Sequence, residues 1–215
     1  MMNNLFKTTK EHEKYWKERK IDWNKDYLKT WNHPHRYMIS AILELFPWIS
    51  LFEMGCGPGP NLLNILLSFK ERKKIQIGGI DINPEAIELA KETFGGGVFK
   101  VGSAEDVMFS DDAADVILTD MLLIYVGWFK INKYLKEIKR LARNHIILCE
   151  FHHKSWWQRL KLKLTSGYNA YNYIKRLRKH GFYDIYMVKI PESAWPGGEP
   201  QKTFGYIIWA KVPIK

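Results

Sequence analysis

The chain has 215 residues and a mass of 25.4 kDa, the size of a single domain with its own hydrophobic core. Hydrophobic residues make up 46% of it and charged residues 26%, a balance that excludes a disordered or fibrous protein. The formal net charge of +10 favours contact with polyanions such as RNA or anionic lipid, although a basic balance can also serve only to keep a protein in solution.

Residues 1–47 are predicted to form helices at the periphery of the domain. The clearest is 33–46, in which apolar residues recur at helical spacing until Pro47 ends the helix. Residues 48–54, WISLFEM, form a short apolar run that is typical of a strand buried on both faces. We therefore divide one domain into an N-terminal helical cap, 1–47, and a main part, 48–215.

Strands and helices then alternate along the chain. The segments predicted to be helical are 61–69, 83–94, 131–142 and 169–182. The segments predicted to be further strands are 74–81, 98–103, 113–121, 145–151, 183–190 and 204–212. The last two strands are joined only by the Pro- and Gly-rich loop 191–203, whose length suits either a lid or plain packing. The pattern predicts an α/β fold: a Rossmann-like, doubly wound, mostly parallel seven-stranded sheet with helices on both faces and a terminal antiparallel strand pair.

The stretch FEMGCGPGPN, residues 52–61, places three glycines at alternate positions directly after the first strand. A doubly wound sheet binds nucleotide-like ligands at such a loop. The dinucleotide fingerprint has a third glycine where this chain has Pro60, which argues against NAD. Asp81 ends the second strand about 20 residues further on, where a carboxylate can accept hydrogen bonds from both ribose hydroxyls of an adenosine. The alternative is that Asp81 only caps the next helix.

Four segments resemble the motifs of the class I S-adenosylmethionine-dependent methyltransferases. FEMGCGPGP is similar to the first motif, GIDINPEAIELAKE to the second, VGSAEDVMF to the third and DVILTDMLLIYV to the fourth. The resemblance covers about residues 48–151, with an extension to the C-terminus. It implies that 48–215 is a class I methyltransferase domain with S-adenosylmethionine as its cofactor, and it implies almost nothing about the methyl acceptor.

The resemblance also implies which residues hold the cofactor. Glu53 would engage its amino end, directly or through the glycine loop, and Asp81 would hold the ribose. Ile82 would pack on the adenine, and Ser103 stands where many relatives have an aspartate that contacts the adenine amino group. The complete set of predicted cofactor-binding residues is Glu53, Gly55, Cys56, Gly57, Gly59, Asp81, Ile82, Ser103, Ala104, Glu105 and Asp120.

Asp120 and Tyr125 are the predicted catalytic residues, because the end of the fourth strand points into the reaction zone of this family. Where relatives that act on small molecules often carry histidines, this chain has Ile124 and Tyr125, so an acid/base role does not carry over. Methyl transfer from a sulfonium is an in-line displacement, which needs a general base only if the acceptor loses a proton early. The alternative for both residues is strand-end structure and core packing.

The predicted acceptor side draws on three segments: His33, His35 and Arg36 before the first strand, His152 and His153 after the fifth, and Trp195 in the loop 191–203. The segment 151–183 holds eight Lys and Arg residues and no acidic one, beside Trp156 and Trp157. It suits an RNA-binding face, an amphipathic segment on a membrane surface, or a solvated helix face. The residues suggest no metal site.

The leading prediction is an S-adenosylmethionine-dependent methyltransferase for a small or medium organic acceptor. An RNA methyltransferase that uses the basic segment 151–183 is the alternative, and a non-catalytic relative that binds the cofactor is a third possibility. The chain lacks the [DN]-P-P-[YF] motif used on exocyclic amino groups of bases and a Pro-Cys nucleophile for cytosine C5. Its two cysteines and the absence of an apolar leader or a long apolar run favour a cytoplasmic location without a transmembrane segment.

Overall fold

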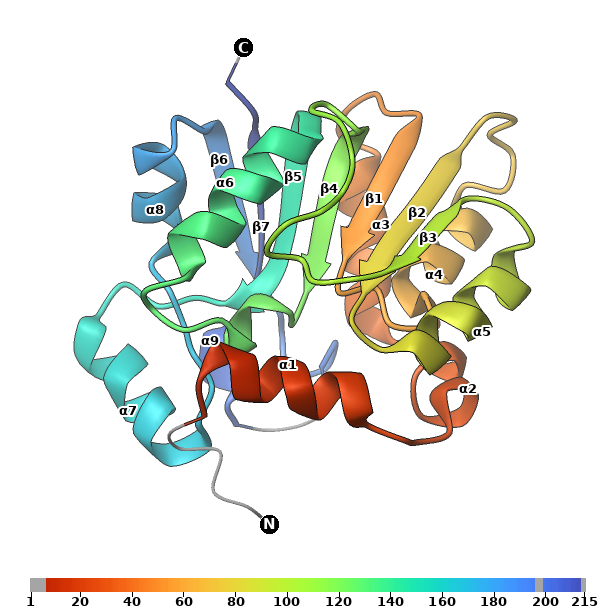
Figure 1. Ribbon diagram of the computed structural model, residues 1–215. Coiled ribbons are helices and arrows are strands. Elements are labelled where there is room, and N and C mark those ends of the chain that lie inside the picture. The colour runs from red at the N-terminus through yellow and green to blue at the C-terminus, as the bar shows by residue number, and fades with distance from the viewer. Residues whose placement is uncertain (1–6, 196–198, 214–215) are drawn as a thin grey trace.

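A mostly parallel sheet of seven strands forms the centre of the molecule (Figure 1). The computed structural model describes residues 7–195 and 199–213 of the chain. The strand order is β3-β2-β1-β4-β5-β7-β6. The strands are β1 (Ser50–Met54), β2 (Gln76–Asp81), β3 (Val98–Val101), β4 (Ala114–Asp120), β5 (Ala142–Phe151), β6 (Tyr183–Lys189) and β7 (Gly205–Lys211).

The pairing of these strands confirms the predicted fold class. β1 pairs in parallel with β2 and with β4, β2 with β3, and β4 with β5. β7 runs antiparallel to both β5 and β6, so the two last strands form the expected terminal pair. The order of the strands along the chain reverses between β1 and β4, which is the position where doubly wound sheets bind their ligands.

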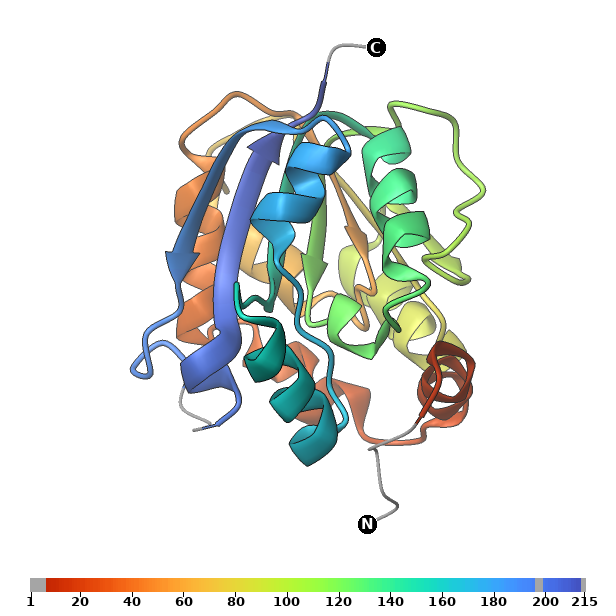
Figure 2. The ribbon, with the colours of Figure 1, turned by 90° about the vertical axis from the view of Figure 1, so that its left-hand side faces the viewer.

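Helices cover both faces of the sheet, and each face has its own apolar core (Figures 1 and 2). The helices on one face are α3 (Pro34–Leu43), α4 (Pro60–Ser68) and α5 (Pro84–Phe94). The helices on the other face are α6 (Ile131–Leu141) and α8 (Tyr173–Lys179). The described helices are all too short or too polar to cross a lipid bilayer.

The N-terminal segment lies across the carboxyl ends of the strands, as Figure 1 shows for α1. Its elements are α1 (Thr9–Glu18), α2 (Trp23–Asp26) and η2 (Leu28–Thr30), followed by α3. Three hydrogen bonds tie α1 to a loop residue, to the N-cap of α5 and to α6: Gly127 N to Thr9 Oγ1 at 2.9 Å, Asn83 Nδ2 to Trp16 O at 2.8 Å and Tyr134 Oη to Glu13 Oε1 at 3.0 Å. The assignment of 1–47 as a cap of the same domain stays a prediction, and its residues 1–6 lie outside the described part.

Two helices lie where the sequence suggested none. Helix α7 (Trp156–Ser166) went unrecognised because its stretch Arg159–Leu164, RLKLKL, alternates with the period of a strand. Helix α9 (Gln201–Phe204) lies in the loop 191–203, whose residues 196–198 are outside the described part. The helix predicted at 169–182 begins only at Tyr173, since the residues before it are held in extended form against the end of β5.

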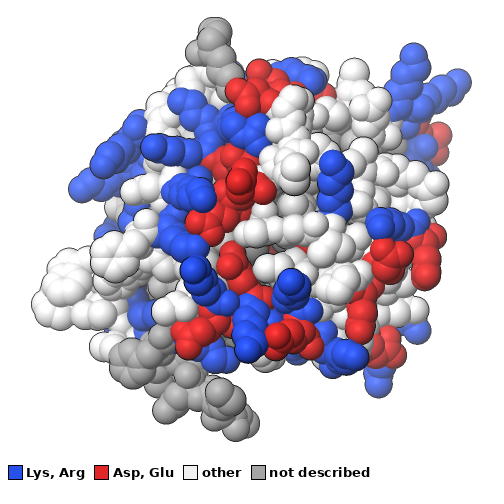
Figure 3. Space-filling model, in the orientation of Figure 1, with Lys and Arg blue, Asp and Glu red and all other residues white. Residues whose placement is uncertain are grey.

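The basic segment 151–183 is divided between two separate helices. Its cations belong either to α7 and the turn before it or to α8, which stands higher on the same side of the molecule in Figure 1. In Figure 3, Lys and Arg gather along the upper left, where Figure 1 has α6 and α8. The eight cations are therefore divided between two helices and the turn before α7.

Glu150, at the carboxyl end of β5, fixes the segment that follows β4. Its Oε1 accepts hydrogen bonds from the backbone N–H groups of Leu122 at 3.1 Å and Leu123 at 3.0 Å. These residues lead into the short helix η3 (Leu123–Tyr125). The Glu150 side chain is fully buried, and burial raises its pKa to about 8, although the two N–H groups oppose the shift.

The raised pKa of Glu150 makes the stability of the protein depend on pH. In the folded protein the Glu150 carboxyl keeps its proton up to about pH 8, whereas in the unfolded chain it loses the proton near pH 4.3. Between these values a rise in pH therefore lowers the free energy of unfolding, by up to about 1.4 kcal/mol per pH unit. Glu150→Gln keeps an oxygen acceptor and removes the titration. We expect its free energy of unfolding, relative to wild type, to increase as pH rises through this window in urea denaturation. Identical pH profiles for the two proteins would contradict this assignment.

Candidate functional site

A cavity of about 380 Å³ lies between α1 and the carboxyl ends of β1, β2 and β4. This volume is within the range of roughly 300–1,000 Å³ that is usual for small-molecule sites. Its walls come from the glycine loop, from the ends of these strands, from the N-terminal segment and from η3. The cavity thus lies at the switch in strand order where the sequence placed a ligand.

The glycine loop presents its backbone to this cavity. Gly55 and Gly57 have φ angles of 75° and 53°, in the left-handed region that favours glycine. Gly55 N donates to Ile80 O at 2.7 Å, which holds the loop against β2. At Gly57, none of the described atoms beyond its chain neighbours lies within 4 Å of where a Cβ would stand. A ligand can therefore approach the backbone of the loop closely.

Asp81 serves the loop and the next helix at once. Its Oδ2 accepts from Gly57 N and its Oδ1 from Asn83 N, both at 2.9 Å. Burial raises the pKa of Asp81, and these N–H groups oppose the shift. The N-cap of α5 is Asn83, whose Oδ1 accepts from Ala86 N at 3.0 Å, so Asp81 supports the turn before the helix and does not cap it. The Asp81 side chain also lines the cavity.

Glu53, near the end of β1, is a buried carboxyl group with a free oxygen. Its side chain is among the most buried polar groups, and Asn61 Nδ2 donates to its Oε1 at 2.6 Å. Its Oε2 has no hydrogen-bond partner among the described residues. Burial raises the pKa of Glu53 well above its usual value. A ligand with a positively charged amino group would supply the missing partner, which is the fit expected for the methionine end of S-adenosylmethionine.

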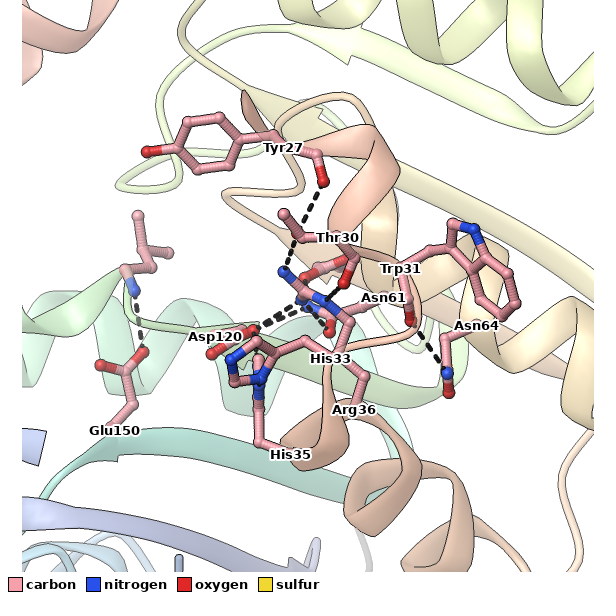
Figure 4. Close-up of polar contacts among 12 residues, drawn as sticks. Tyr27, Thr30, Trp31, His33, His35, Arg36, Asn61, Asn64, Asp120 and Glu150 are labelled. Carbon is pink, nitrogen blue, oxygen red and sulfur yellow. Dashed lines mark hydrogen bonds and ion pairs between the residues drawn. The ribbon is translucent and has the colours of Figure 1, made fainter. Parts of the chain in front are cut away.

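Asp120, the last residue of β4, is the centre of a polar network (Figure 4). Its Oδ2 accepts hydrogen bonds from His35 Nε2 at 3.0 Å, Arg36 Nη1 at 3.1 Å and Asn61 Nδ2 at 3.0 Å. Burial alone would raise the pKa of Asp120, but His35, Arg36 and Asn61 lower it below its usual range. Asp120 is therefore an ionised carboxylate held by three donors, which makes it a poor general base.

His35 continues this network toward the loop 191–203. Its Nδ1 lies 2.6 Å from His33 Nδ1, and its ring stacks on Trp195 with 4.3 Å between ring centres. Its Nε2 also lies within 4.8 Å of ligand atoms of Asp120 and Cys149, a grouping that metal ions can use. Arg36 binds the same carboxylate and would repel a cation there, and burial raises the pKa of the Cys149 thiol. We assign no metal to this group.

An aromatic wall faces the network across the cavity. The ring of Tyr125 lies 5.1 Å from that of His12, 5.5 Å from Trp16 and 5.7 Å from Tyr168. Burial lowers the pKa of His12 to about 4 and raises the pKa of Tyr125, so both side chains are neutral near pH 7. This wall can pack against a flat or apolar group and offers no charge to it.

The cavity brings together most of the residues that the sequence assigned to a ligand. Those that line it are Glu53, Gly55, Cys56, Gly57, Asp81, Ile82, Ser103, Ala104, Asp120, Tyr125, His35, Arg36 and Trp195. Their position is a feature of the structure, while their role in binding stays a prediction.

Some predicted residues do not line the cavity: Gly59, Glu105, His33, His152 and His153. The Glu105 carboxylate pairs with Lys130 Nζ at 2.6 Å, outside the cavity lining. His152 is buried beside α8, where its Nδ1 accepts from Tyr173 N at 3.2 Å and burial lowers its pKa to about 4.

Several residues that line the cavity were not predicted from the sequence. Asn61, in the first turn of α4, donates hydrogen bonds to both Glu53 and Asp120. Helix α1 lines one side of the cavity, although no sequence motif in it indicated a binding site. The unassigned residues that line the cavity include Thr9, His12, Glu13, Trp16, Trp23, Tyr27, Asn61, Tyr134 and Tyr168. The spacing of His12 and Trp16 on one face of α1 was the available signal, but it does not say what that face covers.

Several solved structures share this fold. A chain from the complex between the Haloferax volcanii Trm112 methyltransferase activator and a protein described as a methyltransferase is 18% identical, with a TM-score of 0.65 over 95% of this chain and 98% of that chain. A protein from Pyrococcus horikoshii is 14% identical, with a TM-score of 0.66 over 93% and 99%. The geranyl diphosphate C-methyltransferase of Streptomyces coelicolor is 12% identical, with a TM-score of 0.66 over 95% and 98%. At these identities the three share the fold with this chain.

A search of the curated proteins found no match to this sequence. The sequence model of a family described as "Methyltransferase domain" matches residues 49–189, which include the glycine loop, Asp81 and Asp120. This match covers well over half of the chain, and it agrees with the class I motifs and the sheet order described above. The chain belongs to the methyltransferase domain family.

Proposed function

We propose that the protein is an S-adenosylmethionine-dependent methyltransferase that acts on a small or medium organic molecule. The observation that carries this proposal is the free, buried Oε2 of Glu53 in the same cavity as the glycine loop and Asp81. These groups match the amino end and the ribose of the cofactor. When bound, the cofactor supplies a methyl group already activated on a sulfonium.

The residues of the chain then position the reactants and exclude water. Glu53 would bind the amino group, Asp81 the ribose hydroxyls, and Ile82 and Ala104 the adenine. Ser103 is less available for the adenine than the sequence suggested, because its Oγ donates to Glu13 Oε1 at 3.1 Å. We propose that the cofactor settles between the glycine loop and α1.

Asp120 and Tyr125 would position groups in the reaction rather than remove a proton. Asp120 is held by three donors and its pKa is lowered, and the pKa of the Tyr125 hydroxyl is raised by burial. Asp120 thus keeps Arg36 and His35 in place, and Tyr125 can donate a hydrogen bond to the acceptor. Such a site suits an acceptor atom that is nucleophilic without assistance from a base.

The acceptor end of the cavity favours a small organic molecule over RNA. Its walls are apolar or aromatic and include Met121, Ile124, Tyr125, Phe151 and Tyr168. Among the described residues that line the cavity, the only Lys or Arg is Arg36, which is bonded to Asp120 and to Thr30 O at 3.0 Å. The cations of 151–183 lie on α7 and α8, outside this lining.

Asp81→Asn should weaken binding of S-adenosylhomocysteine about 10- to 100-fold, because it removes a charge that would receive hydrogen bonds from the ribose. Trp16 and Trp23 line the cavity, so tryptophan fluorescence can report the titration. The matched control is Glu88→Gln on the exposed face of α5, where the carboxylate pairs with Lys91 at 2.7 Å. Wild-type affinity in a folded Asp81→Asn variant would contradict the assignment of the ribose site.

Methyl transfer can be measured with methyl-labelled cofactor against small aromatic or apolar molecules and total RNA. We expect label in a small molecule. We also expect Tyr125→Phe to lower kcat/KM by no more than about tenfold, since only one hydrogen bond is lost. Label in RNA would favour the RNA alternative. Cofactor binding without transfer to any acceptor would favour the non-catalytic relative.

A further inference from the structure

Helix α7 carries an exposed apolar surface that the catalytic proposal does not use. Trp156, Trp157 and Leu164 are 51%, 65% and 49% exposed. Leu162 is the buried residue of this helix and packs in a cluster with Phe151 and Phe204. The helix is therefore attached to the protein along one side, while its largest side chains face away from the core.

The exposed side chains of α7 form one continuous patch. The rings of Trp156 and Trp157 stack on one another with 3.8 Å between centres and 27° between planes. Trp157 and Leu164 are seven residues apart and so lie on the same side of a helix, with the half-buried Leu160 between them. We call Trp156, Trp157, Leu160 and Leu164 the α7 patch.

Exposed lysines lie beside the α7 patch. Lys154 and Lys161 are exposed beside it, and the whole segment 151–183 contains no Asp or Glu. In Figure 3 the lower left corner, where Figure 1 places α7, is largely white, and blue residues gather above it along the same edge. An apolar strip that includes tryptophan, flanked by lysines in a segment without acidic residues, is the composition of helices that lie in the interface of an anionic membrane.

Other occupants match these features less well. Single-stranded RNA stacks successive bases on accessible ring faces, but here each tryptophan covers one face of the other and the remaining residues are leucines. A second copy of the chain docked through the same patch would bring the cations of both helices together. An anionic bilayer satisfies the apolar side chains and the lysines at once.

We propose that α7 docks the protein on an anionic lipid bilayer, with the α7 patch in the boundary between headgroups and acyl chains and Lys154 and Lys161 against the headgroups. The helix lies in the interface and does not span the bilayer, in keeping with its 11 residues. Docking needs neither cofactor nor catalysis, so it stands apart from the proposed methyl transfer.

The position of α7 gives this docking a consequence for the cavity. Leu162 shares its apolar cluster with Ile124 and Phe151, and Tyr168 packs against that cluster. Ile124, Phe151 and Tyr168 also form part of the acceptor end of the cavity. If the proposed function holds, a docked protein could take up an acceptor that is itself amphiphilic.

The test is sedimentation of the full-length protein with vesicles of phosphatidylcholine alone or of phosphatidylcholine mixed with phosphatidylglycerol, without cofactor. We expect binding only to the anionic vesicles, with a shift of tryptophan emission to shorter wavelength. The double variant Trp157→Ser, Leu164→Glu should bind at least about tenfold more weakly, and each of Lys154→Gln and Lys161→Gln about fivefold more weakly. Leu67→Glu is the matched control, since Leu67 is 46% exposed on α4, on the other side of the sheet.

Thermal unfolding of each variant checks that it folds. Absence of binding to anionic vesicles at low salt would overturn the proposal, and so would equal binding by wild type and the double variant. Sedimentation with RNA, or a dimer, that depends on the α7 patch while vesicles are not bound would assign the patch to that occupant instead.

Discussion

The ionised carboxylate of Asp120 is the constraint on which the site depends. A buried charge of this kind persists only when it is paired and hydrogen-bonded. Its partners come from the first turns of two helices, His35 and Arg36 from α3 and Asn61 from α4. The positive ends of both helix dipoles therefore also face it. The pairing fixes where α3 and α4 start on the sheet, and removal of one partner would leave a buried charge uncompensated, at a cost of about 3–5 kcal/mol.

The same network prepares the cavity for a ligand. The Asn61 side-chain amide donates a hydrogen bond to Asp120 and another to Glu53. The two carboxyl groups nevertheless differ in protonation state. Asp120 is ionised, whereas burial raises the pKa of Glu53 and leaves Oε2 without a partner among the described residues. The glycine loop and Asp81 stand beside this free oxygen, and α1 covers the opposite side. Stability and ligand binding thus share residues, with Glu53 as the group that a ligand would complete.

The parts of the structure that could be predicted are those set by local pattern. The central strands are apolar runs because both faces of the sheet are covered, and the glycine loop and Asp81 are recognisable by their spacing. Contacts over long distances in the chain could not be predicted in this way. His12 and Trp16 meet Tyr125 more than 100 residues away, and Asn61 gains its role only because β1 and β4 are neighbours. The bounds of helix α7 were not predicted because its leucines and lysines alternate with the period of a strand. Glu105 was predicted to bind the cofactor, but its carboxylate pairs with Lys130.

We propose that Glu53 completes its hydrogen bonds with the amino group of S-adenosylmethionine. Isothermal titration calorimetry of the wild type in buffers of different ionisation enthalpy tests it directly. Because burial raises the pKa of Glu53, a bound ammonium group that restores the ionised carboxylate should release a proton on binding. We expect the wild type to bind one cofactor per chain, with a binding enthalpy that depends on the buffer. The Glu53→Gln variant should lose that dependence. Absence of binding, or binding with the same enthalpy in every buffer, would contradict it.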